Sequence, residues 1–189
     1  MALRLATGNR HKLREFRGLL DGIEITGVPD GFTMPPEVGR SFTENALIKA
    51  RAVARATGEP TIADDSGICV ERLEGRPGIR SARWAGEGAS DRENLELLLA
   101  RTQPGDVLEY VCVIAWVDPV TGEEATFEGR CAGHRAAEPR GDGGFGYDPA
   151  FEADEAPGRT MAELEPAEKD AISHRGRAAG EFLTWLGER

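Results

Sequence analysis

The longest unbroken apolar segment of this chain, residues 110–117, constrains its fold more than any other feature. It has only eight residues, whereas a membrane-spanning helix needs about 20, so it predicts a buried strand and no transmembrane span. Flanking residues extend the expected strand to 107–117, and Asp118, Pro119 and Gly122 predict a turn into a second strand over 124–130. The two segments therefore predict a β-hairpin.

The rest of the chain alternates between strand and helix patterns. Apolar residues at helical spacing run from Leu13 to Leu20, and Ser41 with Glu44 predicts a capping box for a further helix, which Gly58 ends. Alternation followed by a hairpin indicates an α/β fold with a mixed central sheet, and 189 residues suit one domain. The expected strands are 2–7, 24–28, 61–63, 68–70, 107–117 and 124–130, and the expected helices begin after Asn9, Ser41, Ser90 and Ser173.

The net charge limits which kinds of partner this chain can bind, and the cysteines indicate its cellular compartment. A net charge of −10, from 33 acidic and 23 basic residues, argues against duplex nucleic acid, which needs clustered basic side chains. A small phosphorylated ligand needs only a local basic pocket and is compatible with this charge. The N-terminal segment lacks the apolar core of a signal peptide, and the three cysteines neither pair fully nor have the spacing of zinc ligands. We expect a reduced, cytoplasmic protein without a membrane anchor.

Lysine is rare in this chain, with three residues against twenty arginines. Compositional bias explains the arginine excess but not why Lys12, Lys49 and Lys169 are lysine. An ammonium is a compact point charge that fits among close-packed phosphate oxygens, whereas a guanidinium is a wide planar fork. Composition alone leaves open which of these properties, if either, kept the three positions as lysine.

The first candidate binding segment joins the expected first strand to the first helix. Thr7, Gly8 and Asn9 form this turn, and Lys12 follows in the first turn of the helix. Glycine lets the backbone approach a ligand closely, and a helix N-terminus presents N–H groups to anions. An ordinary α/β turn has the same pattern, and the segment is not a Walker loop.

Two adjacent carboxylates, Asp64 and Asp65, end the apolar segment 61–63, and we expect them to break the strand. On a strand neighbouring side chains face opposite ways, so one acid is expected to face a site while the other holds the loop. A carboxylate here can bind Mg²⁺ or act as a general base toward water. The alternative is a turn held by Asx hydrogen bonds. Glu37, in a proline-rich loop, and Glu44 are further candidate metal ligands.

Two later segments carry groups suited to a flat ligand. In the glycine-rich loop a heterocyclic base can stack on Phe145, and Asp148 can accept from a ring N–H; a flexible turn with anchored rings is the alternative. Ser173 is the expected cap of the last helix, which puts His174 and Arg175 at its start. Ser173 and His174 are neighbours in sequence, and a nucleophilic serine needs a base that is oriented separately, so we do not interpret them as a catalytic pair. Arg175 can donate to a ligand carbonyl.

In this order and spacing the motifs resemble the inosine triphosphate pyrophosphatase family, the XTP/dITP diphosphatases. The resemblance spans nearly the whole chain, although Trp84 stands where the family often has tyrosine and loop 29–39 matches only loosely. The matching strings are Thr7-Gly8-Asn9 with Lys12, Phe42-Thr43-Glu44-Asn45-Ala46 with Lys49, Ala63-Asp64-Asp65-Ser66-Gly67, Pro77-Gly78-Ile79-Arg80-Ser81-Ala82-Arg83, Gly144-Phe145-Gly146-Tyr147-Asp148-Pro149, and Glu168-Lys169 with Ile172-Ser173-His174-Arg175.

The resemblance implies a two-lobed single domain over residues 1–189, with a long mixed central sheet flanked by helices and the active site in the cleft between the lobes. It implies a soluble homodimer that uses Mg²⁺ to hydrolyse ITP, dITP and XTP to the monophosphate and pyrophosphate, which removes deaminated purines from the nucleotide pool. By position, Asp65 is the general base and a metal ligand, Glu37 is the second metal ligand, and Glu44 and Asp64 are the next candidates. The implied substrate-binding residues are Thr7, Gly8, Asn9, Arg10, His11, Lys12 and Lys49 on the phosphates, Ser66, and Phe145, Gly146, Tyr147, Asp148, Lys169, His174 and Arg175 around the nucleoside.

The physical chemistry of the residues agrees with this implied role. Phosphoryl transfer needs charge neutralisation and a positioned water more than covalent catalysis. Hypoxanthine and xanthine carry an oxygen at C6 where adenine carries an amino group, so donors from His174 and Arg175 would favour them over adenine. Guanine also has that oxygen, and its rejection does not follow. A pyrophosphatase for modified pyrimidine nucleotides and a non-catalytic nucleotide-binding module are the alternatives.

Overall fold

The computed structural model describes residues 2–189, and its strands form one six-stranded sheet in the order β2-β1-β3-β4-β5-β6. Strand β1 pairs in parallel with β2 and β3, whereas β5 and β6 are antiparallel, so the predicted α/β fold with a mixed sheet is confirmed. The strands are β1 (Ala2–Leu5), β2 (Glu24–Thr26), β3 (Thr61–Val70), β4 (Val107–Val117), β5 (Glu124–Arg135) and β6 (Phe151–Ala153).

The chain divides into two compact units, which are described separately. Unit 1 comprises Met1–Asp65, Cys112–Gly129 and Arg177–Arg189, and unit 2 comprises Ser66–Val111 and Arg130–Gly176. The α-helices are α1 (Arg10–Leu19), α2 (Phe42–Thr57), α3 (Asp91–Arg101), α4 (Pro166–Ile172) and α5 (His174–Gly187). Short 3-10 helices are η1 (Glu71–Leu73), η2 (Gly78–Arg83), η3 (Asp148–Ala150) and η4 (Met161–Glu163).

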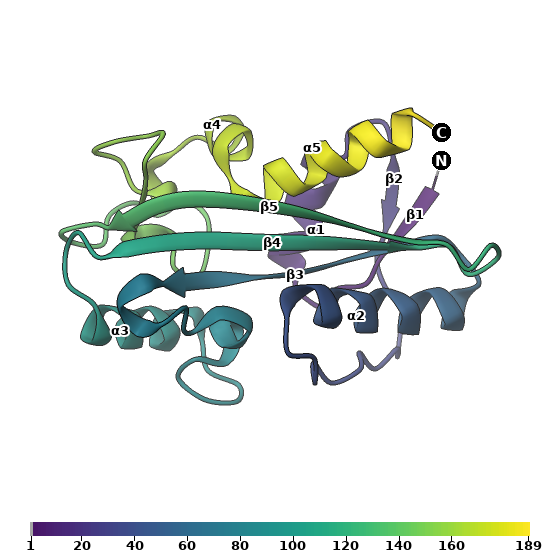
Figure 1. Ribbon diagram of the computed structural model, residues 1–189, viewed down its shortest axis with the longest axis horizontal. Coiled ribbons are helices and arrows are strands. Elements are labelled where there is room, and N and C mark those ends of the chain that lie inside the picture. The colour runs from purple at the N-terminus through teal and green to yellow at the C-terminus, as the bar shows by residue number, and fades with distance from the viewer. Residues whose placement is uncertain (1) are drawn as a thin grey trace. The chain divides into compact units, whose positions relative to one another are not determined.

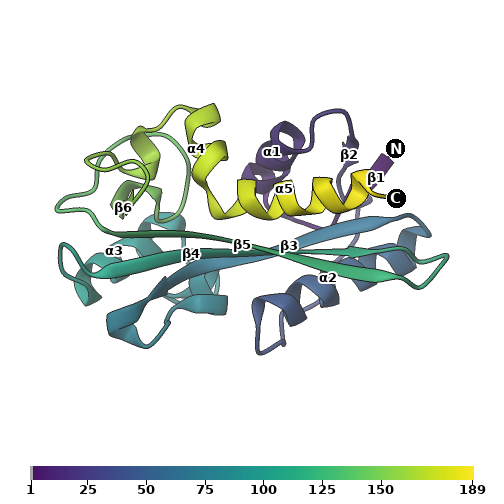
Figure 2. The same cartoon turned by 45° about the horizontal axis from the view of Figure 1, so that its top comes forward.

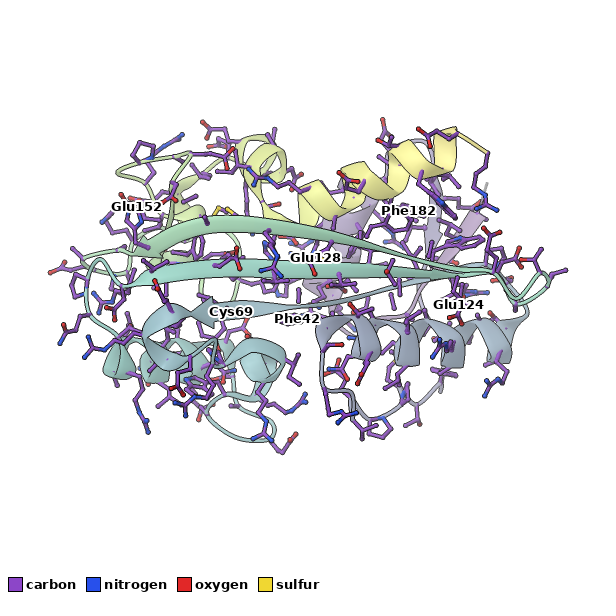
Figure 3. All side chains as sticks on the ribbon, viewed as in Figure 1. Phe42, Cys69, Glu124, Glu128, Glu152 and Phe182 are labelled. Atoms are coloured by element: carbon purple, nitrogen blue, oxygen red, sulfur yellow. The ribbon has the colours of Figure 1, made fainter. Side chains whose placement is uncertain are left out.

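Helices cover both faces of the sheet in unit 1. Helices α1 and α5 lie side by side on one face, and α2 lies on the other (Figures 1 and 2). Phe16 of α1 and Phe182 of α5 pack with Ile114 in one apolar cluster, and Figure 3 shows Phe182 pointing from α5 toward the strands. Ala50 and Val53 of α2 belong to a second cluster. Unit 1 therefore has two core layers, one on each side of the sheet.

Unit 2 has a core cluster of its own. Leu98 of α3, Tyr110 of β4 and Phe151 of β6 are buried together with Met161 and Leu164. Burying such side chains contributes roughly 1.5–3 kcal/mol each, so each unit has an apolar core that can hold functional side chains in place.

Capping residues set the helix boundaries as expected, with one difference. The Asn9 side chain accepts from the N–H groups of His11 and Lys12, and Gly58 ends α2 in the left-handed conformation at φ 71°. Ser41 caps α2 by accepting the Glu44 N–H, but the Glu44 carboxylate accepts the Arg40 N–H rather than that of Ser41. The expected capping box is therefore only half formed.

The expected break in the strand at residues 64–67 is wrong, because β3 runs without interruption from Thr61 to Val70. The Asx-turn alternative for this segment fails with it. Asp64 and Asp65 are buried and bound by lysines from α1 and α2, which offsets the cost of buried charge. At Gly67 a Cβ would lie 2.4 Å from both Gly78 O and Ser81 Oγ. Glycine here allows η2 to approach the strand closely.

Other boundaries differ in length or were not expected. Strand β5 continues to Arg135, five residues beyond the expected end at 130, and β6 and α4 had no expected counterpart. Ser90 forms a full capping box with Glu93 at the start of α3. Among the described residues no helix has the length and apolar composition needed to cross a membrane, and Cys69, Cys112 and Cys131 are not joined in disulfides.

Candidate active site

The N-terminal turn of unit 1 places a lysine against a buried carboxylate. Asn9 caps α1, and its own N–H donates to Thr7 Oγ1 at 3.1 Å. Lys12, in the first turn of α1, puts its Nζ 2.6 Å from Asp64 Oδ2, and the Asp64 side chain is fully buried. Gly8, Arg10 and His11 are exposed beside this pair. The exposed turn and the lysine together offer backbone and side-chain donors to an anion.

A second lysine in unit 1 holds two carboxylates at once. Lys49 Nζ donates to Glu37 Oε1 at 2.6 Å and to Asp65 Oδ1 at 3.0 Å. The side chain of Lys49 is 9% exposed and that of Asp65 is 7% exposed. The mid-helix position of Lys49 predicts more room around its side chain than around Lys12 or Lys169. That prediction is wrong, since Lys49 is as buried as Lys169.

Asn45 completes this cluster and was not among the predicted site residues. Its Nδ2 donates to Asp65 Oδ2 at 3.2 Å, while its Oδ1 accepts the Gly39 N–H at 2.8 Å. The asparagine therefore joins Asp65 to the loop that carries Glu37. Asn45 and Lys49 are four residues apart and so share a helix face. Two polar residues on a helix face that otherwise carries alanines could have indicated in the sequence that Asn45 belongs to the site.

Burial and neighbouring charge shift the pKa values of Asp65 and Lys49. Burial is the main cause of the raised pKa of Asp65, and Glu37 adds to it against the opposing effects of Lys49 and Lys12. Burial would lower the pKa of Lys49, but Asp65, Asp64 and Glu37 together outweigh it and raise the pKa. Lys49 therefore stays charged, and Asp65 has a higher proton affinity than an ordinary aspartate, which suits a group that accepts a proton from water.

The same carboxylates fit a hard divalent cation. Among residues 2–189 there is no group of three or more His, Cys, Asp or Glu side chains that could enclose a metal. Mg²⁺ usually takes only one or two protein carboxylates and fills its remaining positions with waters and phosphate oxygens. Glu37 and Asp65 converge on one ammonium position, which is the donor arrangement such an ion needs. The Glu44 carboxylate instead accepts the Arg40 N–H just before α2.

In unit 2, Asp148 connects several of the predicted residues. Its Oδ2 accepts the Phe145 N–H and the Lys169 ammonium, each at 2.8 Å, and its Oδ1 accepts the Tyr110 hydroxyl at 3.1 Å. Gly144, at φ 68°, leaves room for this carboxylate, because a Cβ there would lie 2.1 Å from Asp148 Oδ2. Asp148 therefore holds the glycine-rich loop and Lys169 together.

Two cations lie beside the Phe145 ring in the same unit. Lys169 Nζ lies 5.3 Å and Arg175 Cζ 5.5 Å from the centre of its ring. Arg175 also donates to Ser66 Oγ at 3.1 Å, and His174 stacks on Tyr110. A half-buried ring with cationic donors beside it can hold a flat heterocycle that carries carbonyl oxygens.

Three other predicted residues have mainly structural contacts. Ser173 Oγ accepts the Gly176 N–H at 3.0 Å, which confirms it as the cap of α5. Tyr147 is buried, and its hydroxyl donates to the Ser81 carbonyl at 2.7 Å. Gly146 N–H donates to Asp91 Oδ2 at 3.1 Å. The sequence did not point to Asp91 or Tyr110, and Ser81 stood only within a matching string, because each contact joins segments far apart in the chain.

The predicted residues thus form two groups, one in each unit. Whether each binds substrate stays a prediction. The group of unit 1 contains Thr7, Gly8, Asn9, Arg10, His11, Lys12, Glu37, Lys49, Asp64 and Asp65. The group of unit 2 contains Ser66, Phe145, Gly146, Tyr147, Asp148, Lys169, His174 and Arg175.

Comparison with known proteins gives consistent matches over the whole chain. Residues 3–185 match the model of the Ham1 family. A protein named dITP/XTP pyrophosphatase from Mycolicibacterium paratuberculosis is 48% identical over 187 residues, covering 93% of this chain and 91% of its own. Its counterpart of the same name from Symbiobacterium thermophilum is 49% identical over 188 residues, covering 96% and 93%.

Solved structures give the same result. A HAM1 protein from Coxiella burnetii superposes with a TM-score of 0.86 at 41% identity over the full length of both chains. The Ham1 protein of Staphylococcus aureus also superposes with a TM-score of 0.86, at 37% identity and again over both full lengths. At these identities the relatives share more than the fold.

Proposed function

Because the chain belongs to the Ham1 family, we propose that it hydrolyses dITP, XTP and ITP to the nucleoside monophosphate and pyrophosphate. This hydrolysis would remove deaminated purines from the nucleotide pool, as the sequence resemblance implies. The observation that carries it is the buried Asp65 carboxylate, bound by Lys49 beside Glu37. A strand interior has no structural need for such a charge, since burying a carboxylate is costly unless it is paired.

The group of unit 1 supplies the chemistry at the phosphates. The N-terminal turn of α1 and the Lys12 ammonium bind phosphate oxygens, and Lys49 neutralises further charge. Glu37 and Asp65 would hold Mg²⁺, which supplies charge neutralisation on the triphosphate when it is bound. Asp65 accepts the proton of the attacking water, and its raised pKa favours that transfer.

The group of unit 2 supplies recognition of the base. Phe145 offers a face for stacking, and the cations of Lys169 and Arg175 lie beside it. Donors from His174 and Arg175 pair with the C6 oxygen of hypoxanthine or xanthine. Adenine presents an amino group at that position, which leaves these donors without a partner and disfavours its binding.

We further propose that the chain is one functional domain and forms a homodimer. Strand β3 carries residues of both groups, because Asp65 is the last residue of one unit-1 segment and Ser66 begins unit 2, and this continuity of the chain supports the single-domain proposal. The homodimer rests on the family resemblance alone, and sedimentation analysis tests it. The cytoplasmic location rests on the three cysteines and the N-terminal segment.

The test is a profile of pyrophosphate release from ITP, dITP, XTP, dUTP, methylated nucleotides and ATP, each with and without Mg²⁺. We expect release from the three deaminated purine nucleotides that depends on Mg²⁺. A preference for dUTP or methylated nucleotides would support the alternative pyrimidine enzyme. Binding of these nucleotides without any release of pyrophosphate would support a binding module and contradict the proposal.

A further inference from the structure

Tyr110 of β4 contacts two of the base-recognition residues at once, and no sequence motif identifies it. Its ring stacks on the His174 imidazole with the centres 4.5 Å apart and the planes 10° apart. The Phe151 ring also stacks on it at 4.4 Å. Its hydroxyl donates to Asp148 Oδ1 at 3.1 Å. Tyr110 is 6% exposed, so these contacts are made in the interior of unit 2.

The stack on His174 controls the direction of a donor. The N–H bonds of an imidazole lie in the plane of its ring, so whatever fixes that plane also fixes where the ring can donate. Tyr110 lies nearly parallel to the imidazole, and Phe151 packs on Tyr110 in turn. Aromatic stacks of this kind are worth about 0.5–1.5 kcal/mol beyond buried area, enough to favour one ring orientation.

The hydroxyl acts on the other side of the group. Asp148 Oδ2 holds the Phe145 N–H and the Lys169 ammonium, while the Tyr110 hydroxyl engages Oδ1. With both oxygens bound, the carboxylate cannot rotate without losing a hydrogen bond. Burial, with the neighbouring Asp148, keeps the pKa of Tyr110 well above its ordinary value, so the hydroxyl stays a donor.

A purely structural role for Tyr110 accounts for less of this geometry. Phenylalanine would fill the same space in the core without a hydroxyl that must be desolvated and paired. Here the hydroxyl is directed at the carboxylate that positions Phe145 and Lys169, and the ring at the histidine. Both contacts of one side chain thus lead to residues assigned to the base.

We propose that Tyr110 is a positioning residue for base selection, which orients His174 by stacking and Asp148 by its hydroxyl. The proposal rests on the proposed function, because it assigns these residues to recognition of the purine. It concerns selectivity and substrate binding rather than proton transfer at the phosphates.

The test separates the hydroxyl from the ring. Tyr110→Phe keeps the stack and removes the hydrogen bond, and Tyr110→Leu removes both. Thr102→Val is the matched control, because Thr102 is a buried residue of unit 2 whose hydroxyl donates to the Leu98 carbonyl at 2.7 Å. Steady-state kinetics with ITP and ATP, calorimetric binding of inosine monophosphate, and thermal unfolding are measured for each variant.

We expect Tyr110→Phe to raise KM for ITP and weaken inosine monophosphate binding about tenfold, as loss of a hydrogen bond to a charged group does. Its kcat should stay within about twofold, since uniform binding is what is lost. The ITP-to-ATP ratio of kcat/KM should fall, and fall further in Tyr110→Leu. Thr102→Val should lower the unfolding temperature to a similar extent without changing KM or that ratio.

A second readout does not depend on turnover. The chain has three histidines, and the ring protons of His174 should show the upfield shift of a stacked ring in NMR spectra. Tyr110→Phe should preserve that shift and Tyr110→Leu should remove it, while a cooperative thermal unfolding transition shows that each variant is folded.

Several outcomes would overturn the inference. One is that Tyr110→Phe leaves KM, inosine monophosphate affinity and the ITP-to-ATP ratio unchanged. Another is that Thr102→Val alters these three quantities as much as Tyr110→Phe does. A third is that the upfield shift of His174 survives in Tyr110→Leu. Failure of the proposed function has a different signature, because the wild-type protein would then release no pyrophosphate from ITP. Inosine monophosphate binding would in that case decide the role of Tyr110, and its absence from the wild type would reject both.

Discussion

Lys12 Nζ lies 2.6 Å from Asp64 Oδ2, while the next residue of the same strand, Asp65, is held by Lys49. Adjacent side chains of a strand face opposite ways, so the two acids contact two different helices, α1 and α2. The expected opposite directions of the two side chains are thus present, but neither acid holds a loop, because β3 is unbroken at this point. Their different partners mean that the two carboxylates are not interchangeable.

Replacing Asp65 by asparagine is expected to lower kcat for ITP by roughly 10²–10⁴-fold, because an amide cannot accept a proton from water. The amide has nearly the same volume, and Lys49 keeps its contact with Glu37, so the fold should survive. Pyrophosphate release and circular dichroism measure the two effects. A folded variant with near-wild-type activity would show that Asp65 is not the base, and Asp64 and Glu37 would be tested next.

Exchange of the three lysines for arginine tests whether a compact ammonium is required. Lys12→Arg and Lys169→Arg are each expected to lower kcat/KM for ITP at least about tenfold, or about 1.4 kcal/mol, since the planar fork does not fit the same space. Lys49→Arg should lower kcat/KM for ITP to the same extent, because the Lys49 ammonium is buried between Glu37 and Asp65.

The controls for the lysine series are arginines outside the motifs, Arg55→Lys and Arg101→Lys, which should keep wild-type kinetics. Steady-state pyrophosphate release at saturating Mg²⁺ is the measurement for all five variants. Wild-type kinetics in both Lys12→Arg and Lys169→Arg would mean that the surviving lysines are an accident of composition.

Asn45→Asp is expected both to lower kcat/KM for ITP and to change the Mg²⁺ concentration needed for half-maximal activity. The Gly39 N–H keeps an acceptor, but the donor to Asp65 becomes a carboxylate oxygen beside another carboxylate. We expect about a tenfold loss of kcat/KM for ITP, in line with a buried polar contact worth about 1–3 kcal/mol, and a shifted Mg²⁺ titration.

Asn94→Asp is the matched control for Asn45→Asp, because Asn94 is buried and joins α3 to the Ala82 carbonyl and the Ala85 N–H in the same manner. It should lower the unfolding temperature and leave the Mg²⁺ titration unchanged. Equal Mg²⁺ titrations in the two variants would argue that Asn45 only stabilises the fold.

Arg175→Ala tests recognition of the C6 oxygen. Losing a charged hydrogen bond costs about 1.5–3 kcal/mol, or about ten- to a hundred-and-fifty-fold, and ITP turnover should fall by this factor while residual ATP turnover changes little. Ser66→Ala, which removes a contact of Arg175, should have a smaller effect in the same direction. Equal losses on both nucleotides would make Arg175 a phosphate-binding or structural residue.

The elements that the sequence predicted are those with local signals. Helix α2 has Ser41 at its start and Gly58 at its end, and the β4–β5 hairpin has its turn residues between two apolar runs. Helix α4 and strand β6 have seven and three residues, which is too few for a periodic pattern. The continuity of β3 depends on two lysines from distant helices, and no local pattern contains that information.

The candidate site divides in the same way. Short motifs identified Asp65, Lys49 and the glycine-rich loop, since their residue types suit the chemistry. Asn45 and Tyr110 act through contacts with residues 20 and 38 positions away. Their polar groups were visible in the sequence, but the direction in which they point is a property of the folded chain.

The uninterrupted course of β3 determines which changes of length this protein can tolerate. A residue inserted just before Asp64 would turn that aspartate toward α2, and would turn Asp65 toward α1, because a shift of one position reverses every side chain of a strand. Both carboxylates would keep their chemistry and lose their partners. The turn between β4 and β5 is exposed from Thr121 to Gly122 and can absorb such an insertion. The contacts of Asp64 and Asp65 thus fix the number of residues in β3, whereas the length of the β4–β5 turn can vary.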